Sequence, residues 1–170
     1  MSGITEQQFL VRPSKGRWSI GECLEHLNIT NRLLLREMEE PLRKARTLGW
    51  MANEPYELGW FARRFVASLE PPIKYKAKAV KTIAPSCDVK LERCQEEWDK
   101  THAEVEQIVL TVDGLDLRKM KVRSPVSKWI KYNLGTALAV IAAHDRRHLW
   151  QAEQVREALA YPKIRVGLAG

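Results

Sequence analysis

The sequence has no apolar run long enough to span a membrane. Its longest such run covers residues 137–143, whereas a spanning helix needs about 20 apolar residues. Residues 1–6 have neither a basic start nor an apolar stretch, so we expect no signal peptide. Three cysteines at irregular spacings form neither a disulfide framework nor a paired zinc motif. These absences favour a cytoplasmic protein without membrane contact.

The chain also lacks repeats and low-complexity tracts, and its composition excludes wholesale disorder. Of the 170 residues, 45% are hydrophobic and 29% are charged, which is typical of a packed globular core. A chain of this length buries about 70% of its unfolded surface on folding. We therefore expect one domain over residues 1–170.

The formal net charge of +7 is compatible with several kinds of anionic partner and selects none of them. Residues 63–81 carry six basic side chains and one acidic side chain, a local charge of +5. Within this segment Lys74, Lys76 and Lys78 alternate and could contact phosphates. Among these alternating residues only Tyr75, on the opposite face, offers an aromatic ring, so a solvated strand edge is the favoured interpretation and nucleic acid is not expected as a partner.

Apolar residues recur at helical spacing in most of the chain, which predicts an all-α protein. Ser19 and Glu22 form a capping box at the start of the first long helix, and Pro41 either kinks that helix or begins a new turn. The expected helices cover residues 19–40, 57–69, 87–112 (capped by Ser86) and 133–160. The expected connecting segments are the lead-in 1–17, the segment 70–85, extended over 73–83, and the segment 113–132.

Three of the four histidines are candidate metal ligands. His144 and His148 are four residues apart on the last helix, so their rings point the same way and can bind one ion. His26 lies on the core side of the first long helix and can join them if the two helices pack together. Three imidazoles leave a coordination position open for a substrate. The alternative is that His26 is hydrogen-bonded in the core and the other two histidines are partly exposed.

Two motifs together resemble a known family. They are the segment Trp-Ser-Ile-Gly-Glu-Cys-Leu-Glu-His-Leu over residues 18–27 and His-Asp-Arg-Arg-His over residues 144–148. In this order and separation they resemble the DinB-like superfamily of metal-binding helical bundles. The resemblance implies an antiparallel four-helix bundle in which His26, His144 and His148 bind a divalent metal, commonly zinc or nickel.

The resemblance also implies a function class. Characterised relatives include transferases and isomerases that use a low-molecular-weight thiol, such as bacillithiol or mycothiol. It thus implies a small-molecule substrate and a thiol-dependent S-transferase or a hydrolase, in which the metal favours the nucleophilic thiolate. The alternative is a non-enzymatic, stress-related binding module with a structural or vestigial metal. The sequence assigns no catalytic residue beyond the three histidines.

The chain departs from the family pattern at its start. The family has a full helix before the Trp-Ser motif, whereas residues 3–9 resemble the end of the connection that follows this helix. A bundle without that helix exposes an apolar groove. We therefore expect a homodimer, in which a second copy covers the groove.

Several other polar residues have a functional and a structural interpretation. His102 and Glu106 are four residues apart and could be ligands, but a solvated pair is favoured. Asp145 points about 100° away from His144 around the helix, so it either orients a second group or pairs with arginine. Arg146 and Arg147 either bind an anionic substrate or lie on the surface. Cys23 either borders the metal site or is a small core residue.

Overall fold

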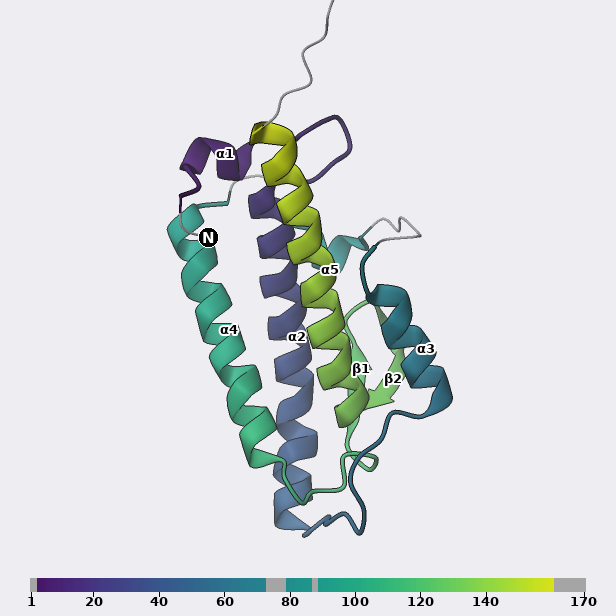
Figure 1. Ribbon diagram of the computed structural model, residues 1–170. Coiled ribbons are helices and arrows are strands. Elements are labelled where there is room, and N and C mark those ends of the chain that lie inside the picture. The colour runs from purple at the N-terminus through teal and green to yellow at the C-terminus, as the bar shows by residue number, and fades with distance from the viewer. Residues whose placement is uncertain (1–2, 73–78, 87–88, 161–170) are drawn as a thin grey trace, which may run out of the picture.

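Four longer helices form an antiparallel bundle, as the sequence predicts (Figure 1). The structure is a computed structural model that describes residues 3–72, 79–86 and 89–160. The helices are α2 (Ile20–Thr47), α3 (Trp60–Leu69), α4 (Leu91–Thr111) and α5 (Leu134–Ala160). Helices α2 and α4 run in one direction, α3 and α5 run in the other, and α2 packs against both α4 and α5. Within the described ranges, no helix combines the length and apolar character that a membrane crossing requires.

Helix α2 begins where its capping box predicts but ends later. The Ser19 hydroxyl accepts a bond of 3.1 Å from the Glu22 amide, and the Glu22 carboxylate accepts one of 2.9 Å from the Ser19 amide. The helix continues through Pro41 to Thr47, so the expected end near residue 40 is wrong. Because Leu42 and Ala45 are buried in the core, their packing offsets the hydrogen bond that Pro41 cannot donate.

The starts of α3 and α4 also differ from the predictions. Helix α3 begins at Trp60, after Gly59, and α4 begins at Leu91, so Ser86 does not cap it. The prediction of an extended conformation is wrong at the end of the segment, where Lys81–Ile83 form the 3-10 helix η1. Residues 73–78 of that prediction lie outside the described residues, as do residues 87 and 88 of the predicted helix start.

A β-hairpin occupies part of the segment expected to be a plain connection. Strands β1 (Lys121–Ser124) and β2 (Ser127–Asn133) pair antiparallel, with Val122 opposite Tyr132. Pro125 lies in the short turn between the two strands. The hairpin packs on α2 and brings the chain to the start of α5 (Figure 1).

The residues before Trp18 contain the short helix α1 (Glu6–Leu10), and none of those that the structure describes forms a long helix. Phe9 is fully buried and lies over Gly21 of α2. A Cβ atom on Gly21 would lie 2.7 Å from Phe9 Cε1, so the glycine is needed for this close contact. The contact fixes the lead-in on the first turn of α2.

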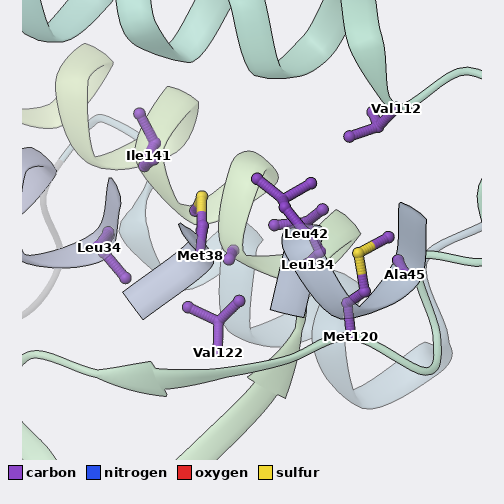
Figure 2. Packing of buried hydrophobic residues seen from close by; sticks show 10 residues of the cluster. Leu34, Met38, Leu42, Ala45, Val112, Met120, Val122, Leu134 and Ile141 are labelled. Atoms are coloured by element: carbon purple, nitrogen blue, oxygen red, sulfur yellow. The ribbon is translucent and has the colours of Figure 1, made fainter. Parts of the chain in front are cut away.

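Two apolar clusters form the core, one toward each end of the bundle. In the first, Met120 and Val122 from the hairpin segment pack with side chains of α2 and α5 (Figure 2). This cluster comprises Leu34, Met38, Leu42, Ala45, Val112, Met120, Val122, Leu134, Ala137 and Ile141. The second cluster comprises Phe9, Ile20, Cys23, Leu24, Val89, Cys94, Ala152 and Val155.

Between the two clusters lies a layer of polar side chains, which we call the polar belt. It falls between Leu24 and Leu34 on α2 and between Ile141 and Ala152 on α5. Most of its members are buried although they can form hydrogen bonds or ionise. The polar belt consists of His26, Asn28, Thr30, Asn31, Thr101, His102, His144, Asp145 and His148. Because buried polar groups need partners, the polar belt is the candidate location of the functional site.

Candidate metal centre

The three predicted histidines meet in the polar belt. His26 comes from α2, and His144 and His148 come from consecutive turns of α5. One ring nitrogen of each lies within 4.8 Å of the others. His26 is 3% exposed and His148 is 7% exposed, whereas His144 is half-buried. The structure therefore brings together all three residues that the sequence proposes as ligands.

Hydrogen bonds at the back of two rings fix which nitrogen faces the group. His26 Nδ1 donates to the Ile83 carbonyl oxygen at 2.6 Å. His148 Nδ1 donates to Gln151 Oε1 at 3.2 Å. Because a neutral imidazole carries one proton, the Nε2 atoms of both rings keep their lone pairs. Such bonds commonly orient metal-binding histidines.

The third ring has an arrangement that a metal ion fits. His144 Nε2 lies 3.3 Å from His26 Nε2. Tetrahedral zinc with metal–nitrogen distances of about 2.0–2.1 Å holds two ligand nitrogens about 3.3–3.4 Å apart. His144 Nδ1 is buried and has no hydrogen-bond partner among the described residues. The fit to a divalent metal therefore rests on the spacing of the two Nε2 atoms and not on Nδ1, which is the other nitrogen of the His144 ring.

The surroundings of the histidines keep them uncharged. Burial, followed by the neighbouring His26 and Arg147, lowers the pKa of His144 to about 3. Burial, His144, His26 and Arg147 lower the pKa of His148 to about 2. Burial also lowers the pKa of His26, and the bond to Ile83 opposes this shift. All three rings are therefore neutral at pH 7, which is the form that binds metals.

Trp18 closes one side of the group. Its ring centroid lies 4.8 Å from that of His26 and 5.6 Å from that of His148. Trp18 directly precedes Ser19, so the capping box of α2 also fixes the position of this ring. The Trp-Ser pair of the sequence motif thus has two structural tasks, which are to start the helix and to cover two of the histidines.

Two other candidate residues lie apart from the histidine group. Cys23 is fully buried in the second apolar cluster, and burial raises the pKa of its thiol to about 12. It is therefore a core residue. His102 does not pair with Glu106 as considered above, because its Nε2 donates to Asp145 Oδ2 at 3.0 Å.

Sequence reasoning missed the network around Asp145. This carboxylate accepts bonds from His102 of α4 and, at 3.0 Å, from Asn31 Nδ2 of α2. It pairs with a histidine and an amide rather than with arginine. The network joins three helices beside the histidine group. The one sequence signal for it is the position of Asp145, which points away from His144 around the helix.

A family model of the DinB superfamily matches residues 1–152, a range that contains both sequence motifs and all three histidines. The chain belongs to the DinB superfamily. No curated protein and no solved structure matches it. In this DinB-superfamily chain the three histidines form a group that could hold a divalent metal ion.

Proposed function

We propose that this DinB-superfamily protein binds one divalent metal, zinc or nickel, through His26, His144 and His148, and transfers a low-molecular-weight thiol to a small electrophile. The observation that carries the proposal is the convergence of three neutral ring nitrogens within 4.8 Å. Neutral imidazoles suit zinc and nickel. Three protein ligands leave a position for a small molecule.

The chemistry needs little from the chain beyond this site. A bound divalent metal supplies positive charge that favours the thiolate over the thiol at neutral pH. The thiol proton passes to solvent, the sulfur forms a bond to an electrophilic carbon, and the leaving group departs with its electron pair. The Ile83 carbonyl and Gln151 hold two of the rings in orientation, and Trp18 shields them from water. We expect the protein to act in the cytoplasm, where such thiols stay reduced.

Metal content tests the proposal directly. The purified protein, without a tag, is expected to contain about one zinc or nickel ion per chain by inductively coupled plasma mass spectrometry after incubation with either metal. His26→Ala, His144→Ala and His148→Ala should each lose stoichiometric metal. His102→Ala is the matched control, because it removes the remaining histidine, which lies outside the group, and it should keep the metal. Retention of metal by two of the three triad variants would overturn the proposal.

A second candidate function is a binding module with a structural metal. It is favoured by the position of the group, which joins two buried helices within the polar belt. A structural ion should raise Tm strongly, because binding to the folded state alone adds to stability. The effect of metal removal on Tm and on turnover distinguishes the two proposed functions. A small change in Tm with loss of thiol transfer supports the enzyme, whereas a large drop in Tm without thiol-dependent or hydrolytic turnover supports the structural role.

A further inference from the structure

Helix α3 exposes aromatic side chains to solvent. It packs against α5, yet none of its ten residues is buried. Trp60 is 66% exposed, Phe61 is 83% exposed and Phe65 is 45% exposed. The rings of Trp60 and Phe61 touch edge to face, with their centroids 4.8 Å apart. A group of exposed aromatic rings on one short helix marks an interaction surface.

Two arginines are interleaved with these rings. At about 3.6 residues per turn, Arg64 falls between Trp60 and Phe61 around the helix, and Arg63 falls on the other side of Trp60. Arg64 Cζ lies 5.7 Å from the centroid of the Trp60 ring, and Arg63 Nη2 donates to the Leu58 carbonyl oxygen at 3.2 Å. Neither contact supplies a negative charge. We call the surface formed by the three rings and the two arginines the outer face of α3.

The outer face of α3 carries a positive charge that nearby acids do not balance. Residues 58–69 contain no acidic side chain. Glu70, which follows the helix, already accepts a bond of 2.9 Å from Arg146 Nε of α5. Aromatic rings together with arginines are typical of helices that lie along the surface of an anionic bilayer, where the rings enter the headgroup region and the cations meet phosphates.

A second copy of the chain is a poorer occupant of this face. A twofold contact places the same surface on both partners, so Arg63 and Arg64 would lie against the same two arginines of the other copy. Like charges repel at such a contact. Charge complementarity therefore favours an anionic surface over a copy of the protein.

We propose that the outer face of α3 binds the surface of a bilayer that contains anionic phospholipids. Trp60 and Phe61 would enter the headgroup region, and Arg63 and Arg64 would contact the lipid phosphates. The expectation of a protein without membrane contact rested on the lack of a spanning run, but a helix that lies along the surface needs no such run. The proposal does not depend on the metal centre, which is formed by α2 and α5.

The test is co-sedimentation of the full-length protein with vesicles of phosphatidylcholine and phosphatidylserine in a three-to-one ratio. Phe61→Ser should lower the partition coefficient at least about tenfold, because one aromatic side chain no longer leaves water. Replacing Arg63 and Arg64 by Gln should lower it about fivefold for each charge. Vesicles of phosphatidylcholine alone should bind the double variant and the wild type equally weakly, because they carry no net negative charge.

The matched controls lie on α4, which Figure 1 shows on the other side of the α2–α5 pair from α3. Leu110→Ser removes an apolar side chain that is 66% exposed, and Lys100→Gln removes an exposed charge. Both controls should bind the anionic vesicles as the wild type does. Because all substituted side chains are exposed, every variant should keep the wild-type Tm, which thermal unfolding checks.

Three results would overturn the proposal. They are a wild-type protein that stays in the supernatant with anionic vesicles, controls that lose as much binding as the α3 variants, and α3 variants that bind as well as the wild type. Single-stranded DNA is tested in parallel, because aromatic rings and arginines also bind bases and phosphates. Binding to DNA without binding to vesicles would assign the outer face of α3 to nucleic acid instead.

Discussion

His102 donates from Nε2 to Asp145 Oδ2 at 3.0 Å and from Nδ1 to the Trp98 carbonyl oxygen at 2.9 Å. Because both partners can only accept, the protonated ring is the form that satisfies both contacts. Burial opposes this charge, but the bonds to Asp145 and Trp98 and the carboxylate charge hold the pKa of His102 above its ordinary value. The pair joins α4 to the helix that carries two candidate ligands.

Asp145→Asn is expected to lower the free energy of unfolding by about 1–3 kcal/mol at pH 6, because it leaves a partly buried cation without its partner. The contribution of a group with a raised pKa is fully present below pH 6.5 and is lost as pH rises through the folded pKa. The loss measured by urea unfolding should therefore be smaller at pH 9. Glu97→Gln is the control, because it breaks the more exposed pair with Arg32 and should change stability by less than about 1 kcal/mol. Equal losses for both variants at pH 6 would contradict this assignment.

The three candidate ligands predict the opposite pH dependence for metal-free protein. In the folded state burial lowers the pKa of His144 to about 3 and that of His148 to about 2, whereas in the unfolded chain both titrate near pH 6.5. The unfolded state thus binds more protons at acid pH, and stability should fall as pH decreases from above 6.5 toward 3. The slope is at most about 1.4 kcal/mol per pH unit for each histidine. Urea unfolding of chelator-treated protein at several pH values measures it.

A variant in which His26, His144 and His148 are all replaced by Gln is the comparison for that slope. It should show a flatter dependence on pH between 6.5 and 4, because it removes the groups that gain protons on unfolding. An unchanged slope would assign the acid sensitivity to carboxylates such as Glu22, whose pKa is raised by burial but lowered overall by Arg12 and Ser19.

Gly135→Ala is expected to destabilise the start of α5. A Cβ atom at Gly135 would lie 2.3 Å from Tyr56 Cε1, and the Tyr56 hydroxyl donates to Asn133 Oδ1 at 2.6 Å. The ring cannot move without breaking that bond, so we expect a loss of about 1–3 kcal/mol. Gly59→Ala is the control, because open space surrounds Gly59, and it should stay within about 0.5 kcal/mol. Thermal unfolding of both variants measures the difference, and similar Tm values would contradict the packing argument.

We propose that the protein is a homodimer whose copies meet at a groove beside α1. The groove has a volume of about 330 Å³ and is lined by Ile4, Ile20, Leu24, Leu149, Ala152, Glu153 and Arg156. Its two charged lining residues, Glu153 and Arg156, pair with each other on α5, so the rest of the lining is apolar and suits contact with a second copy. Light scattering at micromolar concentration should give a dimer, and Leu149→Glu should give a monomer.

Val109→Glu is the control for the dimer, because Val109 is also exposed and apolar but lies on α4, away from the groove. It should leave the dimer intact. A wild-type monomer, or equal dissociation by both variants, would overturn the proposed interface.

Local signals explain which parts of the fold the sequence could predict. The Ser19 capping box and the apolar spacing of residues 133–160 depend on neighbours within a turn or two, and both helix starts are confirmed. Pro41 was misjudged because the burial of Leu42, which keeps α2 helical, is a tertiary effect. The hairpin was missed for a similar reason, since its pairing is stabilised by packing on α2.

The candidate site also combines residues that a local sequence pattern predicts with contacts that only tertiary packing determines. The spacing of His144 and His148 is a local pattern, and His26 was proposed from its place on the core side of the first long helix, which the resemblance to the family supported. The bond between His102 and Asp145 depends on how α4 is rotated against α5, which no spacing within either helix specifies. Arg146 could be noted in the sequence, but its ion pair with Glu70 depends on how the end of α3 lies beside α5.

The polar belt has a consequence for the order in which the bundle loses its structure. Helices in most bundles fray from their ends, where amides exchange with solvent first. Here an apolar cluster lies on each side of the middle, which depends on directional bonds among His26, His144, Asn31 and Asp145. Without an ion, the central turns of α5 should therefore take up deuterium faster than the turns of α5 that pack in the two apolar clusters. Loading with metal should slow exchange there and leave the two apolar clusters nearly unaffected.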